Sequence, residues 1–262
     1  MMNVIALQLD IVWEQKAANH AKVQSMIEKA RPQPGTLLVL PEMFATGFSM
    51  NVAEIHDTDT QETQRFLAQI AKAHRLYLMA GVVTRTPEGR GRNEAVIYSP
   101  EGVEIGRYHK LHPFSIGGES AHYAAGDRLC VVEIERFRVA PMICYDLRFP
   151  EIFRAAVKLG ANLYPVIASW PGLREEHWVT LLKARAIENQ AYVIGVNRCG
   201  SDPKLKYPGR SMIIDPHGRI MVDAGREEVL IGAQLNLEEL SSYRQDFPIL
   251  PDLRSDFVRG PE

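Results

Sequence analysis

Three residues that can take part in covalent chemistry each stand at the end of an apolar or strand-like segment. Cys144 follows the apolar run 139–143, Glu42 follows the run 37–41, and Lys110 follows the alternating segment 103–109. Runs of this length and pattern are typical of β-strands. If the three strands lie side by side, a base, a cation and a thiol meet at one edge of one sheet. The sequence therefore predicts a nucleophilic site made of Glu42, Lys110 and Cys144.

The turn after the cysteine fits this interpretation but does not require it. Pro150 and Glu151 are typical of the first turn of a helix, so Cys144 falls between a strand and a helix, where backbone N–H groups stabilise a thiolate. The alternative is that Cys144 is a small buried apolar residue. Likewise, Glu42 taken alone is compatible with a structural carboxylate, and Lys110 with a solvated charge.

Three short segments carry a resemblance to a known family. The segments Leu-Pro-Glu42, His-Lys110-Leu and Cys144-Tyr-Asp-Leu-Arg-Phe-Pro-Glu, in this order and spacing, resemble the nitrilase (carbon–nitrogen hydrolase) superfamily with its Glu-Lys-Cys triad. The resemblance runs from Val4 to about Leu235.

The resemblance implies a role for each reactive residue. Cys144 is the nucleophile that forms a thioester, and Glu42 is the proton-transferring base. Lys110 stabilises the oxyanion together with the backbone N–H of Tyr145. Glu119 matches a further glutamate of the family, which orients the lysine or the water; the alternative is an acid on the surface of a loop. The implied mechanism needs no cofactor.

Helical and strand patterns alternate from end to end without a repeat or a linker, which predicts one α/β domain over residues 1–262. The resemblance implies more: two mixed sheets face to face with helices outside, a four-layer α-β-β-α sandwich. One strand is expected over 137–142, and a long loop over 111–127, of a length that is usually functional. Helices are expected over 14–30, 62–73, 151–159 and 174–190.

The tail 236–262 has three prolines and scattered apolar residues, and it is expected to be irregular. These apolar residues cover either their own domain or a second subunit, and the resemblance favours a homodimer.

A loop and helix start after residue 168 bear on the substrate. The stretch Ser169-Trp-Pro, with His177-Trp178 and the following helix, looks like the omega-amidase branch of the family, which hydrolyses the terminal amide of 2-oxoglutaramate and similar dicarboxylic monoamides. A short amide with a distal carboxylate is expected to be enclosed by aromatic residues and bound by a cation. Arg174 is the first choice for the cation and Arg148 the second; otherwise Arg148 pairs with Glu151 or Asp146. The remaining substrate-binding candidates are Tyr145, Phe44, Phe114, Trp170 and His177.

Other activities are compatible with the same triad. Nitrile hydrolysis and N-carbamoyl amino acid hydrolysis differ from amide hydrolysis in the pocket and not in the three reactive residues. A redox-sensing or binding module is a non-enzymatic alternative, but such a module needs no aligned carboxylate.

Composition narrows the class of partner. The formal net charge is −2 with no basic block, so nothing favours nucleic acid or an anionic membrane. No apolar run reaches the length of a membrane-spanning helix, and the N-terminus lacks the basic region of a signal peptide. Three widely spaced cysteines favour a reducing, cytoplasmic location without disulfides. His109, His112 and His122 lack a recognisable zinc spacing, so no metal is expected.

Overall fold

The computed structural model describes residues 1–254, and its framework is two mixed β-sheets. The first has seven strands in the order β16-β1-β2-β3-β4-β5, with β6 paired to β4. Strands β1, β2 and β3 are parallel, whereas β4 and β5 join them as antiparallel hairpins. The bounds are β1 (Met2–Gln8), β2 (Leu37–Val39), β3 (Tyr77–Arg85), β4 (Gly91–Tyr98), β5 (Glu104–His109), β6 (Tyr123–Ala124) and β16 (Val229–Leu235).

The second sheet also has seven strands, in the order β15-β14-β11-β10-β8-β7, with β9 paired to β10. Strands β9, β10 and β11 are parallel, so their carboxyl ends lie at the same edge. The bounds are β7 (Val132–Ile134), β8 (Phe137–Val139), β9 (Met142–Ile143), β10 (Leu163–Ala168), β11 (Tyr192–Asn197), β14 (Met212–Ile214) and β15 (Ile220–Asp223). A separate hairpin is formed by β12 (Cys199–Ser201) and β13 (Lys206–Pro208).

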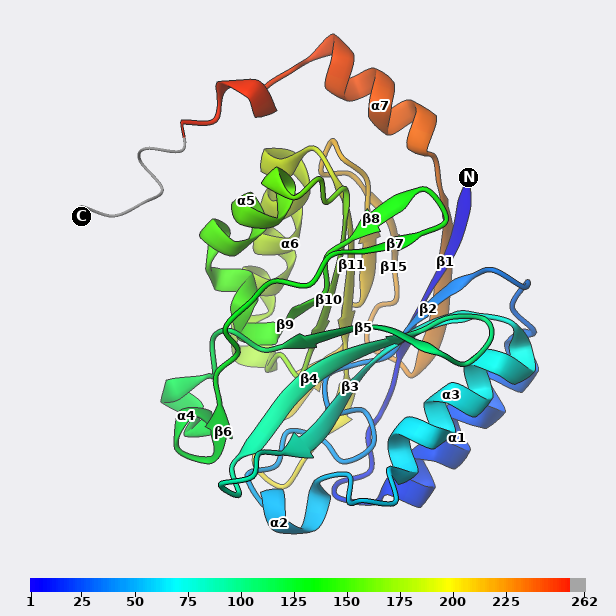
Figure 1. Ribbon diagram of the computed structural model, residues 1–262, viewed down its shortest axis with the longest axis vertical. Coiled ribbons are helices and arrows are strands. Elements are labelled where there is room, and N and C mark those ends of the chain that lie inside the picture. Colours follow the sequence, from blue (N-terminus) through cyan, green and yellow to red (C-terminus); the bar gives the residue numbers. More distant parts are fainter. Residues whose placement is uncertain (255–262) are drawn as a thin grey trace.

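Helices cover the outer face of each sheet, as Figure 1 shows. Helices α1 (Lys16–Ala30) and α3 (Glu62–His74) cover the first sheet, and α5 (Pro150–Lys158) and α6 (Glu175–Asn189) cover the second. Both α1 and α3 end at a residue in the left-handed conformation, Arg31 and Arg75. The fold is therefore the expected four-layer α-β-β-α sandwich, and this prediction is confirmed.

Alternation along the strands explains the layers. In β2, Leu37 and Val39 face the core between the sheets, whereas Leu38 faces the core under α1 and α3. In the second sheet, Ile194 faces the first sheet, whereas its neighbour Gly195 faces α6, where a Cβ would meet Leu182 and Trp178. Phe153 of α5 packs on Tyr164 of β10 under the same outer helices. Because both faces of each sheet are covered, the central strands are apolar throughout and hold their ends rigidly.

Several local expectations were wrong. The predicted strand 137–142 is broken into β8 and β9, which pair with different parts of β10. The loop 111–127 contains the 3-10 turn η1 (Ser115–Gly117) and the short helix α4 (Glu119–His122).

The tail is also less irregular than expected. Residues 237–246 form the helix α7 (Leu237–Asp246), capped by the Asn236 side chain, and the turn η4 (Leu250–Asp252) follows. Figure 1 shows α7 and η4 at one end of the molecule, extending beyond the sheets. The remaining tail residues, 255–262, lie outside the described part of the chain.

Candidate active site

The structure brings the four reactive residues together, but from two sheets instead of one. Glu42 follows β2 and Lys110 follows β5 in the first sheet, whereas Cys144 follows β9 in the second. Glu119 is the first residue of α4. The expectation that all three strands share a sheet was therefore wrong, because the groups meet across the sandwich where strand ends of both sheets face each other.

A buried ion pair network centres on Lys110. Its Nζ donates to Glu42 Oε1 and to Glu119 Oε2, each at 2.8 Å. All three side chains are at most 1% exposed. Burial alone would lower the pKa of Lys110, but Glu119 and Glu42 together raise it well above its ordinary value. Lys110 is therefore a fixed cation, which suits a group that stabilises developing negative charge.

Glu42 is held from three sides. Its Oε1 also accepts from Asn93 Nδ2 at 2.8 Å, and its Oε2 accepts from the backbone N–H of Ser169 at 2.8 Å. The turn that carries Glu42 lies directly against Gly81 of β3: a Cβ there would come within 2.6 Å of the Glu42 Cα. The position of this carboxylate is therefore fixed by both sheets.

The conformation of Cys144 separates it from an ordinary buried cysteine. It begins the 3-10 turn η2 (Cys144–Arg148) with φ of 49°, in the left-handed region that a non-glycine residue rarely adopts. Burial raises the pKa of the Cys144 thiol well above its ordinary value, Glu42 raises it further, and Lys110 opposes both. The residue is consequently a thiol at rest, so an attack by its sulfur needs a neighbouring base to take the proton.

Asn93 was not anticipated from the sequence. It lies in β4, and its Nδ2 donates to Glu42 Oε1 and to Glu119 Oε1, each at 2.8 Å. Because β4 runs between β3 and β5, a side chain from it reaches both carboxylates. A single asparagine inside a strand carries no spacing signal, and no pattern in the sequence would have found it.

A pocket beside Cys144 is lined mainly by aromatic and apolar residues. Of the predicted substrate-binding residues, five line it: Tyr145, Phe114, Trp170, Arg174 and Arg148. Phe48, Ser169, Pro171, Leu205 and Tyr207 complete the lining. The ring of Phe114 lies 4.9 Å from that of Tyr145, and the Arg174 guanidinium lies 5.6 Å from the Phe114 ring. The arrangement leaves space for a short molecule next to the thiol.

Two predicted substrate-binding residues lie elsewhere. Phe44 is fully buried in the core under α1 and α3 and packs near His20 and Phe66, so its assignment to the pocket was wrong. Met43 has a φ of 46°, and the turn brings Phe48 to the pocket instead. His177 is exposed on α6 and reaches the pocket only through Arg148, whose NH2 lies 3.3 Å from His177 Nδ1.

Arg148 does not pair with Glu151 or Asp146, contrary to one expectation. Its guanidinium lies 4.8 Å from the Trp170 ring, and burial together with Arg174 lowers its pKa. Neither Arg148 nor Arg174 forms a salt bridge within residues 1–254. Two arginines therefore face one pocket without an acidic partner in the described chain.

One of the two acids expected to pair with Arg148 binds other residues instead. Asp146 is buried and accepts from the Tyr108 hydroxyl and from the backbone and ring nitrogen of His112. It holds the cysteine turn against β5.

Within residues 1–254 no three His, Cys, Asp or Glu side chains cluster as metal ligands would, and no helix there is long and apolar enough to cross a membrane.

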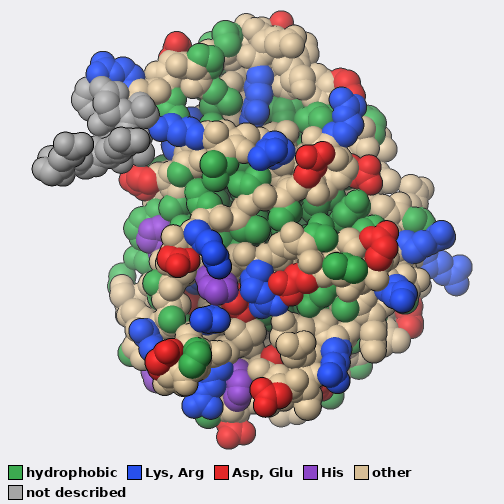
Figure 2. All heavy atoms as spheres, viewed as in Figure 1, with side chains coloured by type: hydrophobic (Ala, Val, Ile, Leu, Met, Phe, Trp, Pro, Cys, Tyr) green, Lys and Arg blue, Asp and Glu red, His purple; other side chains and the backbone are tan. Residues whose placement is uncertain are grey.

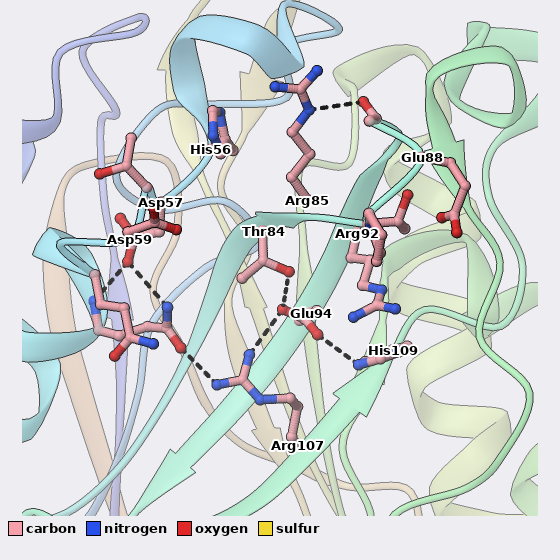
Figure 3. A pocket seen from close by; sticks show the side chains of 16 residues that line it. His56, Asp57, Asp59, Thr84, Arg85, Glu88, Arg92, Glu94, Arg107 and His109 are labelled. Carbon is pink, nitrogen blue, oxygen red and sulfur yellow. Dashed lines mark hydrogen bonds and ion pairs between the residues drawn. The ribbon is translucent and has the colours of Figure 1, made fainter.

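A second hollow, of about 1080 Å³, lies at the hairpin that joins β3 and β4. Figure 3 shows its floor, where buried Glu94 accepts from Thr84, Arg107 and His109. Glu94 and His109 are the neighbours of Asn93 and Lys110 along β4 and β5, so they point to the opposite side of the sheet. The residues that line this hollow include no cysteine or serine. Figure 2 shows that charged side chains of both signs are interspersed over the face seen in Figure 1.

The sequence of this chain is similar to a known family and to several proteins in it. A family model described as carbon-nitrogen hydrolase matches residues 3–245. A protein named 2-oxoglutaramate amidase from Bacillus subtilis (strain 168) is 37% identical over 97% of this chain and 98% of its own length. One named omega-amidase YafV from Yersinia enterocolitica is 40% identical over 96% of each chain.

Solved structures show the same likeness. XC1258 from Xanthomonas campestris, a CN-hydrolase superfamily protein with an arsenic adduct in its active site, has a TM-score of 0.90 at 30% identity, covering 97% of each chain. Saccharomyces cerevisiae Nit3, from branch 10 of the nitrilase superfamily, has a TM-score of 0.86 at 26% identity, covering 95% of this chain and 94% of its own.

Proposed function

Because this chain belongs to the carbon–nitrogen hydrolase family, we propose that it is an omega-amidase, which hydrolyses the terminal amide of a small dicarboxylic acid monoamide such as 2-oxoglutaramate. The observation that carries the proposal is the pocket beside Cys144, where Arg148 and Arg174 have no acidic partner within residues 1–254. A distal carboxylate on the substrate supplies that partner. The proteins named omega-amidase and 2-oxoglutaramate amidase among the relatives support the same reading.

The proposed reaction begins at the thiol. Cys144 Sγ attacks the amide carbon while Glu42 accepts the thiol proton, which the raised pKa of Cys144 makes necessary. Negative charge develops on the carbonyl oxygen, next to the fixed ammonium of Lys110 and the backbone N–H of Tyr145. Glu119 and Asn93 hold Lys110 and Glu42 in place through the bonds described above.

The second half of the reaction reuses the same base. Glu42 gives its proton to the leaving nitrogen, the C–N bond breaks, ammonia departs and a thioester remains on Cys144. A water molecule then gives a proton to Glu42 and attacks the thioester. The carboxylic acid is released, and the thiol recovers its proton. No residue changes its charge over a full cycle.

Substrate charge gives the test. A site that pairs a charge rejects an uncharged analogue by roughly 10²-fold or more, because its own charge is left without a partner. We expect kcat/KM for 2-oxoglutaramate or succinamate to exceed that for butyramide by at least this factor, measured as ammonia release. Arg174→Ala and Arg148→Ala should reduce the value for succinamate much more than the value for butyramide. Equal values for charged and neutral amides in the wild-type enzyme refute the carboxylate-binding pocket.

The same panel should include nitriles and N-carbamoyl amino acids. These alternatives use the same three reactive residues, so only turnover separates them. A nitrile or N-carbamoyl substrate hydrolysed faster than any dicarboxylic monoamide would replace the omega-amidase assignment.

We also propose that the chain is a single catalytic domain, located in the cytoplasm, that acts as a homodimer. Three unpaired cysteines support a reducing compartment. Phe247 is 56% exposed, and α7 and η4 extend from the end of the sandwich, which supports a subunit contact there. Sedimentation of the full chain and of a Phe247→Asp variant tests the dimer: the variant should dissociate at concentrations where the wild type does not.

A further inference from the structure

The hydroxyl of Ser169 is the one polar group lining the candidate pocket that is buried and has no hydrogen-bond partner in the described chain. Ser169 follows the last residue of β10, is 5% exposed, and lines the pocket beside Cys144. Its Oγ makes no hydrogen bond within residues 1–254. A buried hydroxyl without a partner is unfavourable, and such groups in native proteins usually bind a ligand or a water molecule.

The backbone of the same residue places this hydroxyl. The Ser169 N–H donates to Glu42 Oε2 at 2.8 Å, and it also favours the thiolate of Cys144. Ser169 therefore lies between the proposed base and the proposed nucleophile. Lys110 donates to the other oxygen of Glu42, so the ammonium and the backbone of Ser169 bind different oxygens of that carboxylate.

This geometry separates the two polar ends of a bound amide. The carbonyl oxygen belongs beside Lys110, where negative charge is stabilised. The nitrogen belongs beside Glu42, which must protonate it. An amide nitrogen has two N–H groups, and the leaving ammonia has three, so acceptors other than Glu42 are needed there.

We propose that Ser169 Oγ accepts an N–H of the scissile carboxamide and so favours amides over esters at the acylation step. The inference rests on the proposed function, since it concerns the same thioester reaction. The C–S bond forms and the C–N bond breaks as before, and the proton travels from the thiol through Glu42 to nitrogen. The serine neither gains nor loses a proton, so it binds the leaving group throughout.

Paired substrates test this role. Succinamate and monomethyl succinate share one acyl group, but the ester oxygen has no hydrogen to donate. We expect Ser169→Ala to lower kcat/KM for succinamate by about tenfold or more, as the loss of one well-placed hydrogen bond implies. The kcat/KM for monomethyl succinate should change less than about threefold, because the ester does not make the hydrogen bond that the substitution removes. Because kcat/KM reports only the steps through departure of the leaving group, later hydrolysis does not affect the comparison.

Stability supplies an independent readout. Removing an unpaired buried hydroxyl should leave the melting temperature unchanged or raise it, whereas removing a structural one lowers it. Ser99→Ala is the matched control: Ser99 is buried in a turn remote from Cys144, and its Oγ is bonded to Glu101. It should lower the melting temperature and leave both rates unchanged.

The outcomes separate this inference from the proposed function. Equal losses for amide and ester, or no loss for either, overturn the role of Ser169 while leaving the omega-amidase assignment intact. A wild-type enzyme that cleaves no dicarboxylic monoamide overturns the proposed function itself, and this is seen before any variant is made.

Discussion

Asn93 provides a sharp test of how the site is held, because one side-chain amide donates to both buried carboxylates. In Asn93→Leu the volume is kept and both donors are lost. Glu42 Oε1 retains Lys110 as a donor, whereas Glu119 Oε1 loses the partner it has in the described chain. A hydrogen bond to a charged group is worth about 1.5–3 kcal/mol, so two of them predict a loss of roughly 3–6 kcal/mol in the free energy of unfolding.

The catalytic effect should exceed what stability alone explains. Small displacements of a catalytic group cost about 10²-fold in rate, so kcat for amide hydrolysis should fall by about that factor while KM changes little. Urea unfolding gives the stability, and ammonia release from folded protein gives kcat and KM.

A variant on the other side of the sheet serves as the control. Glu94→Gln lies next to Asn93 on β4, disturbs the buried bonds to Arg107 and His109, and should lower stability without lowering kcat of the folded enzyme. If Asn93→Leu retains wild-type kcat, or if Glu94→Gln loses as much activity, the positioning role of Asn93 is refuted.

Three further predictions concern the base, the close packing around it and acid stability. Glu42→Gln keeps the shape of the side chain but transfers no proton, so kcat should fall by about 10²–10⁴-fold; activity within tenfold of wild type, measured by ammonia release, would place the base elsewhere. Gly81→Ala puts a Cβ 2.5 Å from Met43 N, which must displace the turn carrying Glu42; we expect reduced kcat from a folded protein, and unchanged kcat would show that the turn yields freely. Burial alone would raise the pKa of Glu94, but the His109 and Arg107 contacts lower it below its ordinary value of 4.5. The stabilisation that the Glu94 carboxylate contributes is therefore complete above pH 4.5 and is lost as the pH falls through the pKa of the folded state. Between pH 6 and about pH 3, urea unfolding should show a smaller loss of stability for Glu94→Gln than for the wild type. Parallel losses would contradict this.

The sequence anticipated the meeting of Glu42, Lys110 and Cys144 better than it anticipated their surroundings, for a physical reason. Glu42, Lys110 and Cys144 each follow a strand, and strand ends determine where side chains meet. The two sheets could not be told apart, because an apolar run looks alike in either sheet, and this is why Cys144 was expected beside the other two.

The misplaced and missed residues have local causes. Phe44 and Phe48 are separated by a turn that follows the left-handed Met43, and periodicity does not extend through such a residue. Asn93 and Ser169 act through contacts between segments far apart in the chain, with Glu42 51 and 127 positions away. Helix α7 is largely polar, so only its cap at Asn236 and the acids of its first turn marked it.

The central claim is that hydrolysis passes through a thioester on Cys144, and rapid-quench intact-mass analysis tests it most directly. The wild-type enzyme mixed with succinamate should gain the mass of a succinyl group within the first turnover and lose it as the substrate is consumed. Peptide mapping should place the group on Cys144, and Cys144→Ala should stay folded, gain no mass and release no ammonia. Ammonia release by folded Cys144→Ala, or an acyl group on another residue of the wild type, would contradict the account.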